Sequence, residues 1–191
     1  MIPISALLFS VFITIVLIPI FSRLAIRFGA VDLPEPRKIH TRPVPRIGGA
    51  AIALGVYIPV LFWATADNFV NAYLAGGGIL IAFGLVDDLK GLNYKWKFLG
   101  QLLAALVIVF YGGIRITFLG SLLPEDVQLA EWFAVALTLV VIVGVTNAIN
   151  LADGLDGLAG GISLLGFCSI AYFAYLVEGD AVFLLSLALA G

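Results

Sequence analysis

The sequence predicts an all-α polytopic membrane protein: a helix bundle with six complete transmembrane helices, a truncated seventh, and the N-terminus outside. Hydrophobic residues make up 62% of the 191 positions and charged residues only 12%. Soluble domains average about half apolar and a quarter charged. The apolar residues also gather in long uncharged runs. Helices suit such runs, because lipid offers no hydrogen-bond partner to an open backbone.

Six uncharged runs are long enough to cross a bilayer, which takes about 20 helical residues. They are residues 2–22, 48–66, 68–86, 98–114, 132–152 and 157–177. The first is too long for the core of a signal peptide, so we expect it to be a retained span. A seventh run, 181–191, is too short to cross. We therefore expect residues 1–191 to form a single integral membrane domain, the N-terminal part of a longer protein.

The charged residues predict the orientation. Three loops, at 23–47, 87–97 and between the fifth and sixth runs, lie on one side of the membrane if every run spans. That side then holds nine of the ten basic residues, all except Arg115. The positive-inside rule makes it cytoplasmic. The net charge of -2 is small and suggests no nucleic-acid partner.

The most informative stretch is NAINLADGLDGLAGG, residues 147–161, in which polar side chains recur at every third position. They are Asn147, Asn150, Asp153 and Asp156. On a continuing helix the two aspartates would rotate toward lipid, so the glycines at 154 and 157 predict that the helix ends near Asn150. The four side chains could then converge. Hard oxygen ligands suit Mg²⁺ or Mn²⁺, and this favours a metal site over a simple helix cap.

A second polar cluster ends the third run. Asp87 and Asp88 are adjacent carboxylates at a helix C-terminus, where the helix dipole disfavours negative charge. A metal or phosphate partner, with Lys97 at the start of the next run, explains them better than an ordinary solvated turn.

The third cluster is the basic loop PEPRKIHTRPVPRIGG, residues 34–49. Its prolines restrict the backbone, so Lys38, His40 and Arg46 can be presented in a fixed array that suits phosphates. Taken alone, this loop is better explained as a topogenic or lipid-headgroup patch. Together, the three loops place carboxylates, amides and cations on one cytoplasmic face. These are the groups that phosphoryl transfer to a membrane lipid requires.

Three motifs, RKIHTRPVPRIGG, VDDLKGLNYKWKFLGQ and TNAINLADGLDGLAGG, occur in this order. They resemble those of the polyprenyl-phosphate N-acetylhexosamine-1-phosphate transferases, glycosyltransferase family 4. The PVPRIGG stretch is similar to the undecaprenyl-phosphate GlcNAc-1-phosphate transferase branch. The resemblance covers all 191 residues.

The resemblance implies a reaction and a location. Undecaprenyl phosphate would attack the β-phosphorus of a UDP-N-acetylhexosamine, above all UDP-GlcNAc, with Mg²⁺ or Mn²⁺ required. The products would be undecaprenyl-diphosphate-sugar and UMP. This would be the initiating step of a cell-envelope polysaccharide such as lipopolysaccharide or teichoic acid. The enzyme would lie in the bacterial cytoplasmic membrane with its active site facing the cytoplasm, and the resemblance leaves a homodimer open.

The resemblance also implies roles for individual residues. Asp87, Asp88, Asp153 and Asp156 would be catalytic, the first two by deprotonating the lipid phosphate or assisting the metal. Asn150 would be a metal ligand. Substrate binding would fall to Lys38, His40, Arg46, Lys97 and Asn147. Family members carry about ten spans and further site residues in their second half, so we expect the 191-residue chain to hold part of the site and to be inactive alone.

Two alternatives compete with this interpretation. CDP-alcohol phosphotransferases also use aspartate motifs rich in Asp-Gly, but their pattern needs an Ala-Arg step where this chain has Ala159 followed by Gly160. A transporter with a cytoplasmic anion site would place polar residues deep in several spans, and these spans have few.

Overall fold

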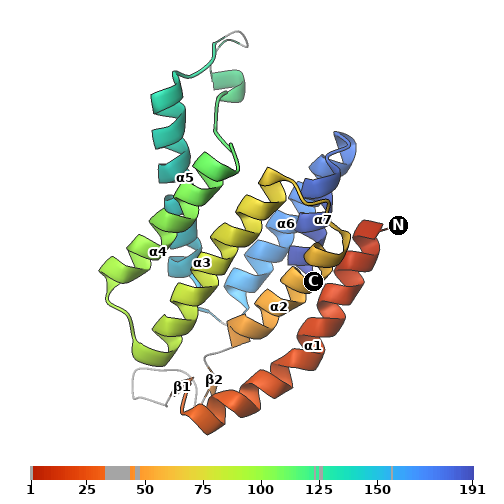
Figure 1. Cartoon of the computed structure of the whole chain (residues 1–191), viewed down its shortest axis with the longest axis vertical. Helices are drawn as coiled ribbons and strands as arrows, with labels where there is room; N and C mark the ends of the chain where they lie inside the picture. Colours follow the sequence, from red (N-terminus) through yellow and green to blue (C-terminus); the bar gives the residue numbers. More distant parts are fainter. Residues whose placement is uncertain (1, 33–43, 46–47, 123, 125–126, 156) are drawn as a thin grey trace. The chain divides into compact units, whose positions relative to one another are not determined.

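The computed structural model describes residues 2–32, 44–45, 48–122, 124, 127–155 and 157–191 (Figure 1). Apart from two two-residue strands, its regular elements are helices. The chain divides into two compact units, each described by itself below. The first consists of Met1–Thr65, Ile81–Leu92 and Gly160–Gly191, and the second of Ala66–Leu80 and Asn93–Ala159.

Three helices pack together in the first unit: α1 (Ile2–Phe28), α2 (Gly48–Trp63) and α7 (Asp180–Ala190). In Figure 1, α1 in red runs beside α2 in orange. Small residues line the contacts, as membrane helices require for close approach. Ala6, Ala51 and Ala188 are fully buried, and the Ser10 hydroxyl donates a hydrogen bond of 2.7 Å to the Ala188 carbonyl.

Two short strands pair with each other at the basic loop, one just before it and one near its end. Strand β1 (Val31–Asp32) pairs antiparallel with β2 (Val44–Pro45), with Val31 opposite Pro45. This pairing brings together the two ends of the loop after α1. Lys38, His40 and Arg46 lie outside the described residues.

The second unit is built on α4 (Tyr94–Leu106) and α5 (Glu131–Ala152), which pack against each other. Helix α4 continues into a π-helical turn, η1 (Val107–Tyr111), and a 3₁₀ turn, η2 (Gly120–Leu122), follows. The first half of α3 (Asn68–Lys90) packs here through Gly76, where a side chain would meet Ile108 and the Ala104 carbonyl.

The helices confirm the predicted all-α membrane class. Within the described residues, five helices are long and apolar enough to cross a bilayer: α1, α3, α4 with η1, α5 and α6 (Leu158–Leu176). Their large apolar side chains are mostly exposed, such as Leu8, Phe12 and Ile15 on α1, which fits contact with lipid. Helix α2 has only 16 residues, fewer than the roughly 20 needed for a direct crossing. The count of six complete spans and the external N-terminus stay predictions.

Candidate active site

The Asp87–Asp88 pair lies in the last turn of α3, as predicted. Helix α3 ends at Lys90 and is followed by Gly91, whose φ of 65° is left-handed, a conformation that glycine adopts without strain. The Gly91 N–H donates to the Asp87 carbonyl at 2.7 Å, which closes the helix in an αL motif. The Leu92 N–H donates to Oδ1 of Asp87 at 2.8 Å. One carboxylate oxygen of Asp87 therefore fixes the end of its own helix.

The predicted phosphate-binding lysine lies at the start of α4. Asn93 is the N-cap of this helix, and its Oδ1 accepts the Lys95 N–H at 3.3 Å. Lys97 lies in the first turn, and Gln101 follows four residues later, about one helical turn along the same face. Gln101 is buried and Lys97 is exposed.

The C-terminal part of α5 supplies two amides. Nδ2 of Asn147 donates to Oε1 of Gln101 at 2.6 Å and to the Val143 carbonyl at 2.9 Å. In return, Nε2 of Gln101 donates to Oδ1 of Asn147 at 3.4 Å. A pair of reciprocal hydrogen bonds thus links α4 to α5. Asn150, one turn further along α5, makes no side-chain hydrogen bond within the described part of the chain.

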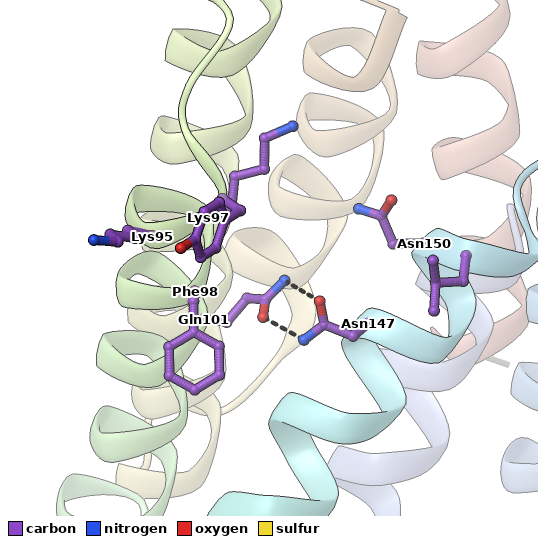
Figure 2. A pocket seen from close by; sticks show the side chains of 8 residues that line it. Lys95, Lys97, Phe98, Gln101, Asn147 and Asn150 are labelled. Atoms are coloured by element: carbon purple, nitrogen blue, oxygen red, sulfur yellow. Dashed lines mark hydrogen bonds between the residues drawn. The ribbon is translucent and has the colours of Figure 1, made fainter.

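Side chains from α4 and from the C-terminal part of α5 line a cavity of about 420 Å³. This volume is within the range of roughly 300–1,000 Å³ typical of small-molecule sites. Its lining residues are Tyr94, Lys95, Lys97, Phe98, Gln101, Asn147, Asn150 and Leu151. Figure 2 shows Lys97 and Asn150 extending to the same side of the Gln101–Asn147 pair, while Lys95 points away from it. The described lining holds cations and amides but no carboxylate, so the cavity favours an anionic group such as a phosphate.

The predicted convergence of four oxygen-bearing side chains holds for two of them. Asn147 and Asn150 line the cavity, but Asp153 does not. Helix α5 ends near Asn150 as predicted, at Ala152, where the Asp153 N–H still bonds to the Ile149 carbonyl at 3.1 Å. Asp153 is therefore at the exposed C-cap of α5. Asp156 lies outside the described residues.

The metal prediction fits the cavity only with help from a substrate. No group of three or more His, Cys, Asp or Glu side chains that could hold a metal ion occurs among the described residues. Asn150 nevertheless offers a hard amide oxygen to the cavity. Mg²⁺ is commonly bound through one or two protein oxygens, with substrate phosphates and water completing its shell. Asn150 suits that mode of binding, and the metal itself stays a prediction.

The comparison with known proteins decides the family. The model of "Glycosyl transferase family 4" matches residues 70–191. The chain is also 43% identical, over 185 residues, to a "Probable undecaprenyl-phosphate N-acetylglucosaminyl 1-phosphate transferase" of Bacillus subtilis; the match covers 96% of the chain and 51% of that relative. The chain belongs to glycosyl transferase family 4.

Two further relatives of this family 4 chain carry related names. A "Decaprenyl-phosphate N-acetylglucosaminephosphotransferase" of Mycolicibacterium smegmatis is 39% identical, over 79% of the chain and 40% of the relative. An "Undecaprenyl-phosphate alpha-N-acetylglucosaminyl 1-phosphate transferase" of Escherichia coli K12 is 30% identical, over 87% of the chain and 46% of the relative. The chain thus spans about half the length of the curated relatives it matches.

One residue that lines the cavity was not predicted from the sequence. Gln101 was not predicted to take part, yet it binds Asn147 across the two helices. A signal was present, because Gln101 is a polar residue inside the uncharged run 98–114, and polar residues in membrane spans usually face a partner or a site. The sequence offered no way to identify that partner, which lies 46 residues away.

Proposed function

We propose that the protein carrying this chain transfers GlcNAc-1-phosphate from UDP-GlcNAc to undecaprenyl phosphate. The observation that carries the proposal is the 43% identity to the Bacillus subtilis relative over 96% of the chain. The names of the relatives from Escherichia coli and Mycolicibacterium smegmatis agree on GlcNAc phosphate and a polyprenyl phosphate. The phosphate-compatible cavity between α4 and α5 supports a nucleotide diphosphate as donor.

The proposed reaction is a displacement at phosphorus. An oxygen of the lipid phosphate attacks the β-phosphorus of UDP-GlcNAc, and the bond from that phosphorus to the oxygen bridging it to the α-phosphorus breaks. UMP leaves with the bridging oxygen, and undecaprenyl-diphosphate-GlcNAc is formed. Because the reactants are anions, positive charge and positioned hydrogen-bond donors must offset their repulsion.

Different residues of this chain have different roles in the proposed reaction. Lys97, which lines the cavity, pairs with a diphosphate oxygen of the donor. Asn150 presents its amide oxygen to Mg²⁺, which, when bound, would neutralise charge on the phosphates. Asp87 and Asp88 keep the lipid phosphate in its reactive, deprotonated form or assist the metal. Lys38, His40 and Arg46 add phosphate contacts, and Asp153 and Asp156 act in catalysis or nucleotide binding.

The apolar helices support the second half of the proposal. In the part of the chain that the structure describes, five helices are suited to a bilayer by length and composition, so a lipid phosphate can reach the enzyme without leaving the membrane. We place the protein in the bacterial cytoplasmic membrane with its site facing the cytoplasm, where nucleotide sugars are made. The reaction would start the synthesis of a cell-envelope polysaccharide.

The test uses membranes from cells that express the gene containing this sequence. We expect UMP to be released from UDP-GlcNAc when undecaprenyl phosphate and Mg²⁺ are both added, together with a radiolabelled glycolipid. Omission of either addition is the control. Release of CMP from a CDP-alcohol, with no UMP from UDP-GlcNAc, would instead assign the protein to the CDP-alcohol phosphotransferases.

A further inference from the structure

We infer that Gln101 is a positioning residue. Together with Asn147 it forms a paired-amide lock, defined as the two reciprocal hydrogen bonds between these side chains, which sets the rotation of α5 against α4. The lock thereby fixes Asn150 relative to Lys97. The inference rests on the proposed function, since it concerns how the same cavity holds the diphosphate of the donor.

Gln101 carries a buried amide. Only 9% of this residue is exposed, and ordering a glutamine side chain costs more conformational entropy than ordering most others. Burial of an amide is favourable only when its polar atoms are hydrogen-bonded. Both polar atoms of the Gln101 side chain bond to Asn147. The burial and the pairing are thus parts of one arrangement.

Hydrogen bonds within the protein orient the Asn147 amide. Its Nδ2 has two hydrogens, and these are directed at Oε1 of Gln101, 2.6 Å away, and at the Val143 carbonyl, 2.9 Å away. Both donors of this amide are therefore occupied inside the protein. An amide oriented in this way is suited to holding helices in place, and it has no donor left for a phosphate.

The spacing of residues along α4 and α5 places the lock close to the groups proposed to bind the donor. Gln101 follows Lys97 by four residues, which is about 6 Å along α4, and Asn147 precedes Asn150 by three residues, about 4.5 Å along α5. The lock therefore lies about one turn from both of the groups proposed to bind the diphosphate and its metal. Rotation of α5 about its own axis would move Asn150 away from Lys97, and the lock opposes that rotation. In Figure 2, the side chains of Lys97 and Asn150 extend to the same side of the lock.

Apolar packing alone restrains the rotation of membrane helices only weakly. Between membrane helices the hydrophobic effect gives little preference for one rotation over another, because lipid is as apolar as a leucine side chain. Buried side chains such as Ala104 and Ala105 on α4 and Ala134 on α5 are small and apolar, so they form no directional bond. A directional pair of hydrogen bonds is the feature that selects one rotation.

The experiment is a double-mutant cycle on the UDP-GlcNAc reaction with Gln101→Met, Asn147→Leu and the double variant. Both substitutions replace the amide by an apolar group of similar size. We expect each single variant to raise the KM for UDP-GlcNAc by about tenfold, the effect expected when one interhelical hydrogen-bonded contact is lost. The double variant should be no worse than either single one, because the same lock is broken in all three. Gln128→Met, at an exposed glutamine outside the helices, is the matched control and should leave the KM unchanged.

Two kinetic outcomes would overturn the inference. Multiplicative losses, with Asn147→Leu more severe than Gln101→Met, would show that Asn147 binds substrate directly, as its motif position implies. A fall in kcat in proportion to the amount of folded protein, with KM unchanged, would show that the pair is structural only.

A second measurement does not depend on activity. Amide hydrogen exchange at residues 146–152 of the purified protein should be faster in Gln101→Met than in Gln128→Met, because the end of α5 is no longer held. Unchanged exchange would overturn the lock. If the unmodified protein released no UMP while exchange responded as expected, the proposed function would fail and the lock would stand.

Discussion

The side chains that matter most are those with oxygen or nitrogen atoms directed at the α4–α5 cavity. Among them, Asn150 is the amide that makes no side-chain hydrogen bond within the described residues, whereas Asn147 and Gln101 bond to each other. The Asn150 amide is therefore available to a ligand, whereas the amides of Asn147 and Gln101 hold α4 and α5 together. This difference leads to a prediction at a single position.

We expect Asn150→Ala to weaken metal use more than nucleotide use. The substitution removes one hard oxygen from the cavity and leaves Lys97 in place. The Mg²⁺ concentration that gives half-maximal activity should rise roughly tenfold or more, the range found when groups that support a metal are removed. A Mg²⁺ titration at saturating UDP-GlcNAc measures it, with Asn68→Ala, an exposed residue at the start of α3, as control. An unchanged titration would move the ligand role to Asp153 or Asp156.

We expect Asp87→Asn and Asp88→Asn each to lower turnover by ~10²–10⁴-fold, the usual range for loss of an acid–base group. Folding should be preserved. Asparagine at 87 keeps the oxygen that accepts the Leu92 N–H, so the end of α3 can still close. Turnover per folded protein, measured as UMP release, is the readout.

Asp67→Asn is the matched control for this pair. The Asp67 side chain caps the other end of α3 by accepting the Val70 N–H at 2.7 Å, and asparagine caps helices about as well as aspartate. This variant should keep nearly full turnover. Near-normal turnover in both the Asp87 and Asp88 variants would reduce the pair to a helix cap.

At the scale of the elements, the ends of helices carry the chemistry and glycines allow those ends to form. Helix α3 closes at Gly91, three residues after Asp88, and the Asn93 cap of α4 lies two residues before Lys95. Further along, α4 ends in the π-helical turn Val107–Tyr111, followed by Gly112. A side-chain carbon at Gly112 would lie 2.6 Å from the Ile108 carbonyl oxygen and 2.8 Å from Cβ of Ala72.

We therefore expect Gly112→Ala to destabilise the second unit by about 1–3 kcal/mol, the usual cost of overpacking. The backbone must shift, because the nearest atom is a carbonyl oxygen rather than a flexible side chain. Gly144→Ala on α5, where an added carbon meets nothing within 4 Å, is the matched control and should not be destabilising. Thermal unfolding of the two purified variants in the same detergent is the measurement. Equal midpoints would show that α3 and η1 are not closely packed at this point.

At the scale of the whole molecule, the distribution of charge predicts how the chain lies in the membrane. Nine of the ten basic residues fall in the loops predicted to be cytoplasmic, and that side should carry the active site. The orientation can be tested because the chain has one cysteine, Cys168, which is replaced by serine first.

We expect a cysteine introduced at Lys90 to react with a membrane-impermeant maleimide only after the cells are opened. A cysteine at Leu122, an exposed position in the loop before α5, should react in intact cells. The physical reason is that basic loops are retained on the cytoplasmic side. The reverse labelling pattern would invert the predicted topology and place the aspartates outside.

Much of this protein could be predicted from the sequence, because the deciding forces are local or compositional. An uncharged run of about 20 residues is a membrane helix wherever it packs, since lipid excludes other backbone structures. The Asp87–Asp88 pair and Asn150 were placed correctly near helix ends, because glycine following polar residues stops a helix regardless of its neighbours.

Only the tertiary structure decided which polar groups meet. The Gln101–Asn147 pair joins residues 46 positions apart, and it depends on the rotation of two helices that sequence periodicity does not define when nearly every face is apolar. The hydrogen bond from the Asp153 N–H to the Ile149 carbonyl carries α5 two residues beyond Asn150. Asp153 consequently lies outside the cavity in this structure. Residue types and loop polarity determine where such a chain can act, whereas directional bonds between helices determine which of its side chains act together.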